Sequence, residues 1–309
     1  MNAKQWLKIL FIFMVSIVAL LELKYQIFPL HRHEVDYLLK EQLPKLKNKS
    51  YKTIILGDSL AHNAFSILKL KKGILDLTSN KAISLAGDYY ILKRYLKQNS
   101  SPKEVYLFAI PAFLHYELNS YLTYSYYETV FTHEEEIQEM QKLKPELYRD
   151  LFTIDRFFEK RDNAFNFSGY KPKERKKYLK IEEKDLKKNA HYMNQKIKDN
   201  IVEATNFRDI IEEMPKVYFD KIMAICKQKG IKLTVVIEPV FKAYNPLYYG
   251  SKWDNYLKEK ATNGDIVYKN INDYYQFNVY FFKKDGRHLN KKVNQYYQGL
   301  LDKHVLDLF

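Results

Sequence analysis

A serine near one end of the chain and an Asp-His pair near the other could together carry out acyl transfer on the serine. Ser59 ends the tripeptide Gly57-Asp58-Ser59, and Asp285 and His288 stand near the other end of the chain. A serine hydroxyl is a weak nucleophile until a base takes its proton, and an acid beside that base holds the imidazolium that forms. The residue types therefore predict Ser59 as the nucleophile, His288 as the base and Asp285 as the acid that orients His288.

Each of these motifs also has a purely structural interpretation. Asp and Ser cap helices in many Gly-Asp-Ser turns, Asp285-Gly286 is an ordinary turn dipeptide, and His288 could be an exposed polar residue. The order of the motifs favours chemistry, because Ser59 follows the first strand of an α/β pattern and the Asp-x-x-His segment precedes the last helix. The three residues are therefore interpreted as one candidate site.

The elements predicted around Ser59 place it at a strand-to-helix turn. Residues 53–56 are a short apolar run closed by Gly57, and a helical pattern resumes at Ala61. A hydroxyl at such a turn projects at the carboxyl edge of a parallel sheet, where ligand sites of open α/β sheets collect. Backbone amides at the start of the helix can hold a developing oxyanion.

The rest of the chain continues this alternation on both sides of a long insertion. Further strands are expected at residues 82–85, 105–110, 233–237 and 265–271, and helices at residues 90–96, 215–229 and 290–308. Continuous apolar strands alternating with helices predict an α/β fold with a central parallel sheet that is buried on both faces. Residues 115–214 break the pattern and predict a largely helical insertion, whose tyrosines and lysines suit either an anionic glycan or ordinary packing and a solvated face.

The N-terminal segment predicts a membrane anchor or a signal segment over residues 1–24. An apolar run spans residues 9–21 after Lys4 and Lys8, and no small-x-small cleavage site follows it. The basic residues on the short side predict a single-pass segment in the inner or cytoplasmic membrane, with the N-terminus inside and the body extracytoplasmic. A buried core helix is the alternative. Residues 25–50 are then a connecting helix and residues 51–309 the catalytic domain.

The composition narrows the class of partner. The formal net charge is +14, with 51 Lys and Arg against 37 Asp and Glu, which favours anionic surroundings such as lipid headgroups or acidic envelope polymers. Cys226 is the only cysteine, so no intrachain disulfide can form. We expect no metal and no cofactor, because the Cys and His spacing of metal sites is absent. We also expect no nucleic-acid partner, since no basic recognition helix, aromatic RNA-binding motif or zinc finger is present.

The same motifs resemble the GDSL/SGNH hydrolase-like superfamily. Residues 54–60 resemble its first block, Gly87 its second, and residues 285–290 its fifth. The resemblance implies a three-layer, flavodoxin-like α/β fold with Ser59, Asp285 and His288 as a triad. It further implies the amides of Ser59 and Gly87 as oxyanion donors, with Gly57 and Asp58 structural at the site. The asparagine of the family's third block is missing, since residues 108–112 read Phe-Ala-Ile-Pro-Ala.

The membrane segment and the altered third block most resemble the cell-envelope branch of this superfamily. That branch includes alginate O-acetylation proteins, peptidoglycan O-acetyltransferases and the teichoic-acid D-alanylation protein. The resemblance implies a serine O-acyl(acetyl)transferase that passes an acyl group to an envelope glycan beside a multi-spanning membrane O-acyltransferase. An esterase acting on a carbohydrate or lipid ester with the same triad is one alternative. A non-catalytic envelope scaffold or glycan-binding protein is another.

Overall fold

The computed structural model describes residues 3–27, 34–65, 70–79, 83–110, 130–143, 210–241, 248–278, 281–283 and 288–305. The strands of its sheet are β1 (Thr53–Gly57), β2 (Ile74–Asp76), β3 (Glu104–Ala109), β4 (Lys232–Ile237) and β5 (Val267–Asn270). The longer helices are α1 (Ala3–Ile27), α4 (Ser59–Phe65), α5 (Ser84–Gln98), α7 (Glu134–Leu143), α12 (Glu213–Gln228), α14 (Lys252–Thr262) and α15 (Lys291–His304). Short helical pieces are α2 (Glu34–Tyr37), η1 (Leu38–Gln42), α3 (Leu43–Lys45) and η6 (Ile271–Asp273).

The five strands form one parallel sheet in the order β2-β1-β3-β4-β5. The chain leaves β1 toward one edge to form β2 and then crosses back to form β3 on the other side of β1. This reversal puts the topological switch point between β1 and β3, where ligands of doubly wound sheets bind. Ser59 follows β1 after a single residue, Asp58, and therefore lies at this position.

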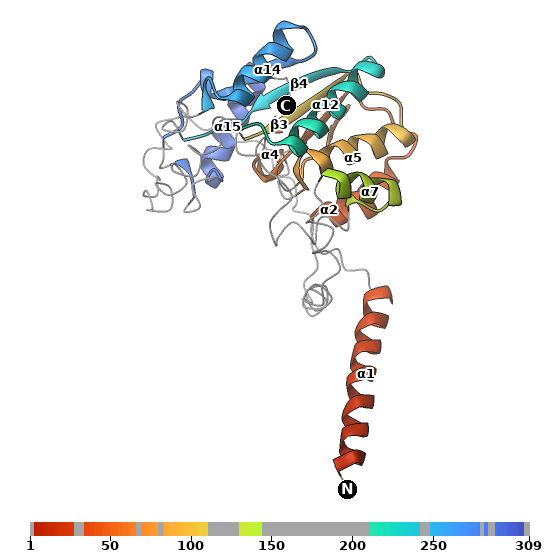
Figure 1. Ribbon diagram of the computed structural model, residues 1–309. Helices are drawn as coiled ribbons and strands as arrows, with labels where there is room; N and C mark the ends of the chain where they lie inside the picture. The colour runs from red at the N-terminus through yellow and green to blue at the C-terminus, as the bar shows by residue number, and fades with distance from the viewer. Residues whose placement is uncertain are drawn as a thin grey trace.

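Alternate residues of each strand pack against different helices, so the body has three layers (Figure 1). One core cluster joins apolar strand residues to side chains of α5, α12 and α14, among them Ile54, Leu107, Tyr90, Tyr218 and Trp253. The cluster on the other face joins strand residues to side chains of α4 and α15, among them Ile55, Phe108, Val236, Phe65 and Tyr297. The predicted α/β class with a parallel sheet buried on both faces is confirmed.

Most of the predicted elements agree with the structure, but the second strand is wrong. The strands expected at residues 53–56, 105–110, 233–237 and 265–271 correspond to β1, β3, β4 and β5. Of the expected strand at residues 82–85, the described residues 83–85 form no strand, because α5 begins at Ser84, and the second strand is the three-residue β2. A four-residue apolar run at the start of a buried helix has the same composition as a short strand, so the pattern could not separate the two. The helix α14 was not predicted.

The expected connecting helix is packed into the body. From residue 34 onward its described part contains α2, η1 and α3. The side chains of Val35, Leu38 and Leu43 are buried in the same core as β1 and α5. Gln42 also donates a hydrogen bond to the carbonyl oxygen of Asp76 at the end of β2 (3.3 Å). This segment therefore covers the sheet.

The described part of the predicted insertion contains one helix, α7. The Arg94 side chain of α5 donates hydrogen bonds to Thr132 Oγ1 (2.9 Å) and Glu136 Oε2 (3.0 Å) at the start of α7. This ion pair docks α7 on α5. Residues 144–209, which carry most of the expected insertion, lie outside the described residues.

Helix α1 runs for 25 residues and is drawn apart from the α/β body (Figure 1). Its apolar side chains are exposed, with Phe11 at 69%, Phe13 at 62% and Leu20 at 64%. None of the helices in the described ranges combines the length and the apolar composition that crossing a bilayer requires.

Candidate active site

Ser59 and His288 meet at the carboxyl edge of the sheet. The hydroxyl oxygen of Ser59 lies 2.9 Å from Nε2 of His288, although the two residues are 229 positions apart in the sequence. Both side chains are only partly buried. With the ring proton on Nδ1, Nε2 accepts the hydroxyl proton of Ser59, which is the geometry of a nucleophile and its general base.

The turn that presents Ser59 is built by Gly57 and Asp58. Gly57 has a φ of +149°, a backbone conformation that side chains disfavour. The buried Asp58 accepts the N–H of Leu60 on its Oδ1 (2.7 Å), and its carbonyl oxygen accepts the N–H of His62 (2.8 Å). Asp58 thereby caps α4 and fixes Ser59 as the first residue of that helix. The roles of Gly57 and Asp58 at an active site stay predictions.

His288 is held by a short antiparallel pairing that precedes α15. The carbonyl oxygen of His288 accepts the N–H of Lys283 (2.7 Å), and Phe281 accepts the N–H of Asn290 (3.0 Å). The side chain of Asn290 then accepts the N–H of Val293 (3.0 Å) and caps α15. These bonds fix the direction of the chain on both sides of the imidazole.

Helix α15 packs directly on α4, which joins the two halves of the site. Tyr297 and Leu301 of α15 lie with Phe65 of α4 in one core cluster. The side chain of Gln298 donates a hydrogen bond to the carbonyl oxygen of Ala64 at the end of α4. The packing therefore ties the helix that carries Ser59 to the helix that follows His288.

The site roles of two further residues, Asp285 and Gly87, stay predictions. Asp285 belongs to residues 284–287 and lies outside the described residues. The motif predicted that Gly87 follows a strand. Instead, Gly87 lies in the first turn of α5. It packs so closely that a Cβ atom there would lie 2.3 Å from Cβ of Ile83. This contact alone requires a glycine, and the oxyanion role of Gly87 stays a prediction.

Two buried acids beside the Ser59 turn were not predicted. Asp88 of α5 and Glu238, directly after β4, are fully buried. Burial raises the pKa of Asp88 well above its usual range, the nearby charge of Asp58 raises it further, and the Gly57 N–H opposes the shift. Burial likewise raises the pKa of Glu238, together with the charge of Asp58 and a hydrogen bond to it, whereas the Tyr297 hydroxyl lowers it. The signal in the sequence for Glu238 is its position as a charged residue immediately after the apolar run of residues 233–237.

Backbone contacts hold Glu238 in place. Asn272 donates from Nδ2 to the carbonyl oxygen of Glu238 (3.0 Å) and accepts the N–H of Val240 on its Oδ1 (3.0 Å). Asn272 lies in η6, directly after β5. The first residues after β4 are therefore fixed by the neighbouring strand connection.

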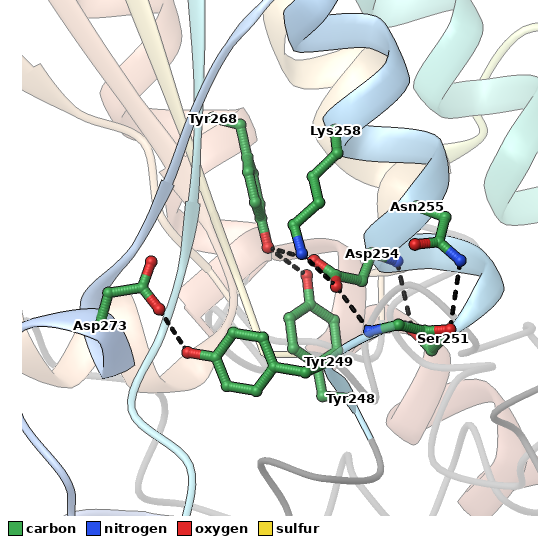
Figure 2. A network of polar contacts seen from close by, with 9 residues as sticks. Tyr248, Tyr249, Ser251, Asp254, Asn255, Lys258, Tyr268 and Asp273 are labelled. Carbon is green, nitrogen blue, oxygen red and sulfur yellow. Dashed lines mark hydrogen bonds and ion pairs between the residues drawn. The ribbon is translucent and has the colours of Figure 1, made fainter.

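A polar network stabilises the segment that begins at Tyr248 (Figure 2). The hydroxyl of Tyr268 on β5 donates to Oδ1 of the buried Asp254 (2.9 Å) and lies 2.9 Å from the hydroxyl of Tyr248. Oδ2 of Asp254 accepts the Gly250 N–H and the Lys258 ammonium, both at 2.7 Å. This network fixes the start of α14 against β5.

The described residues contain no other site of comparable chemistry. A surface cavity lined by Lys227, Lys232 and Asp265 lies where β4 and β5 begin, at the sheet edge opposite to Ser59. Within the same residues, no group of three His, Cys, Asp or Glu side chains is arranged to hold a metal ion. Neither a scan against protein-family models nor a search of the curated proteins finds a match to this chain.

Proposed function

We propose that the chain is a serine-dependent O-acyl(acetyl)transferase of the SGNH type, with Ser59 as the nucleophile and His288 as the base. The observation that carries the proposal is the 2.9 Å contact between Ser59 Oγ and His288 Nε2 at the switch point of a parallel sheet. The capped turn at Asp58 supports it, since a nucleophile must be presented in one geometry. Asp285 completes the triad in this proposal and orients the imidazole.

The reaction runs in two steps through an acyl-serine. His288 takes the proton of Ser59 as Oγ attacks the acyl carbon of a donor ester, and the departing oxygen takes that proton from His288. An acceptor hydroxyl then gives its proton to His288 as it attacks the acyl carbon. The bond from Ser59 to the acyl group breaks, and the proton returns to Ser59. The amides of Ser59 and Gly87 stabilise the oxyanion of each step in this scheme.

The acceptor class rests on charge and on the N-terminal helix. The net charge of +14 favours an anionic glycan of the cell envelope as the acceptor. The exposed apolar side chains of α1 support a body held at the outer face of the inner or cytoplasmic membrane, beside a multi-spanning O-acyltransferase that supplies the acyl group. Fractionation of cells that express the full chain tests this placement. Recovery in the membrane pellet that depends on residues 3–27 supports it, and recovery in the soluble fraction contradicts it.

Hydrolysis of a carbohydrate or lipid ester is the second candidate. It is favoured by the partial exposure of Ser59, which leaves room for water as the acceptor. The two functions differ only in what discharges the acyl-serine.

The experiment that separates them follows the discharge of the acyl-enzyme. The full chain in mild detergent is acylated with an activated acetyl ester, and short envelope glycans are then added, with Ser59→Ala as the control. Transfer predicts that the glycan shortens the lifetime of the adduct and becomes acetylated. Release of acetate at one rate with every acceptor would favour the esterase. A folded chain that forms no Ser59-dependent adduct would contradict both functions and favour the scaffold.

A further inference from the structure

A second histidine, His62, lies one helical turn after Ser59. Both residues belong to α4, and the His62 N–H donates to the carbonyl oxygen of Asp58 (2.8 Å), which closes the helical turn between them. Side chains three residues apart on a helix share one face, with Cβ atoms about 5–6 Å apart. Ser59 and His62 are both partly buried. Their side chains are therefore neighbours on α4.

One backbone contact decides which nitrogen of the His62 ring carries a proton. Nδ1 of His62 lies 3.1 Å from the carbonyl oxygen of Thr78. Because a carbonyl oxygen can only accept, Nδ1 is the donor in this contact. In the neutral ring the lone pair is then on Nε2. Nε2 has no hydrogen-bond partner within the described ranges, so it is left to accept one.

The carbonyl group that holds His62 is itself fixed by the loop after β2. The N–H and the hydroxyl of Thr78 both donate to Oδ1 of Asp76, at 3.0 and 2.5 Å. The next residue, Ser79, donates its N–H to the carbonyl oxygen of Gly57 at the end of β1 (2.9 Å). The loop therefore runs beside the strand that presents the nucleophile, and it orients the imidazole of His62.

The two histidines reach α4 from different parts of the fold. His288 precedes α15, which packs on α4, whereas His62 is tied to the loop after β2. Nε2 of His288 is engaged by the serine hydroxyl, and Nε2 of His62 is open to a ligand. A nitrogen that accepts binds an O–H or N–H group and has no hydrogen bond to offer a carbonyl or carboxylate oxygen. The matching chemistry is a hydroxyl, which every sugar acceptor carries.

We propose that His62 is an acceptor-binding residue, whose Nε2 accepts a hydrogen bond from a hydroxyl of the incoming glycan. This role rests on the proposed function of Ser59. The attacking hydroxyl gives its proton to His288, and a neighbouring hydroxyl of the same sugar donates to His62. His62 gains and loses no proton in either step. A sugar that is held beside the acyl-serine competes better with water, because its attacking hydroxyl is already in place.

Two substitutions separate the two nitrogens of the His62 ring. The amide of His62→Asn can replace Nδ1 as the donor to the Thr78 carbonyl oxygen but is too short to replace Nε2. The amide of His62→Gln reaches the position of Nε2 but gives up the contact that Nδ1 makes. If His62 only ties α4 to the loop after β2, Asn preserves its role and Gln does not. The proposal predicts the reverse.

The test follows acylation and discharge of the full chain in mild detergent. The chain is acylated with an activated acetyl ester, and a short oligosaccharide of uronic acid or of N-acetylglucosamine is then added. Acylation of both variants is expected to stay within about two-fold of the wild type. Discharge by the oligosaccharide is expected to fall about five-fold or more in His62→Asn and to be largely restored in His62→Gln. His133→Asn is the control, because His133 is exposed and directly precedes α7, and it is expected to change neither rate.

Three results of this experiment would overturn the proposal. The first is discharge of His62→Asn at the wild-type rate. The second is a loss in His62→Asn that His62→Gln does not restore. The third is a fall in acylation as large as the fall in discharge, since that would show a displaced Ser59.

Binding to a chain that cannot be acylated distinguishes failure of this proposal from failure of the proposed function. The same oligosaccharides are titrated calorimetrically into Ser59→Ala and into Ser59→Ala with His62→Asn. The second protein is expected to bind about five-fold more weakly. Equal affinity, or no binding of either oligosaccharide, overturns the role of His62, whereas acylation of Ser59 would still support the proposed function. A wild type that no activated ester acylates ends the proposed function, while binding that depends on His62 would leave the hydroxyl site standing.

Discussion

A Cβ atom on Gly57 would lie 2.6 Å from the carbonyl oxygen of Phe108, its partner in the neighbouring strand. The same atom would also lie 2.8 Å from Cβ of Phe108, and the φ of Gly57 is +149°. Phe108 is central to the core on the α4 face and cannot move freely. The close approach of β1 to β3 therefore depends on the absence of a side chain one step before the Asp58-Ser59 turn.

Replacing Gly57 by alanine is expected to cost stability and to misplace Ser59. The clash with backbone and the unfavourable φ together predict a loss of about 2–4 kcal/mol in the free energy of unfolding. Denaturant unfolding of the full chain measures this. Gly230→Ala is the control, because Gly230 also has a positive φ (+65°) but no atom within 4 Å of its Cβ position. The control is expected to lose only about 1 kcal/mol, and an equal loss in both variants would contradict the steric account.

Removing the imidazole of His288 is expected to abolish acylation without unfolding the chain. The contact of 2.9 Å with Ser59 Oγ makes His288 the group that takes the serine proton. Loss of the base predicts a fall of roughly 10³-fold or more in the rate of acylation by an activated ester. His304→Gln at the end of α15 is the control, since His304 stacks on Tyr274 and not on the site. Wild-type acylation by His288→Ala would rule out this role.

The sequence predicted elements whose composition is distinctive, but it did not predict features that depend on burial between distant parts of the chain. The apolar runs before Gly57 and at residues 233–237 predicted β1 and β4, because central strands buried on both faces have a composition that few other elements share. The short edge strand β2 has no such run, and the helical start at Ser84 resembles a strand in composition. These two features explain the error around Gly87.

In the candidate site, too, some residues were predicted from local motifs and others were found only in the folded structure. Ser59 and His288 were predicted from local motifs, and the fold brings them together across 229 residues. Asp88 and Glu238 carry no motif, and their meeting with Asp58 depends on the packing of α5 and β4 on β1. No local pattern encodes a contact between elements so far apart in the chain, so these buried acids could be found only in three dimensions.

The buried Asp88 is expected to make stability depend on pH. Its folded pKa is raised above the unfolded value, so its contribution to stability is fully present below the unfolded pKa and is lost as pH rises through the folded pKa. As pH rises from the unfolded pKa toward the folded pKa, one such group lowers the free energy of unfolding by up to ~1.4 kcal/mol per pH unit. Asp88→Asn, which cannot ionise, is expected to flatten this slope. Parallel curves for the two proteins in denaturant unfolding would contradict a protonated Asp88.

The hydroxyl of Tyr268 is expected to stabilise the α14 region. Tyr268→Phe leaves Oδ1 of the buried Asp254 without this donor and removes the partner of the Tyr248 hydroxyl (Figure 2). The expected loss is about 1–3 kcal/mol in the free energy of unfolding. Tyr249→Phe is the matched control, because the Tyr249 hydroxyl bonds Asp273 at an exposed position. A control that loses as much as Tyr268→Phe would show that burial of the network does not set its contribution.

The most direct test of the account is the mass of the chain after brief exposure to an activated acetyl ester. The account predicts one acetyl group per chain, located on Ser59 by peptide mapping, absent in Ser59→Ala and formed far more slowly in His288→Ala. The geometry of the pair supports this result, because the serine hydroxyl already lies within hydrogen-bond distance of its base. A folded wild-type chain that gains no mass, or that gains it equally in Ser59→Ala, would contradict the assignment of Ser59 as the nucleophile.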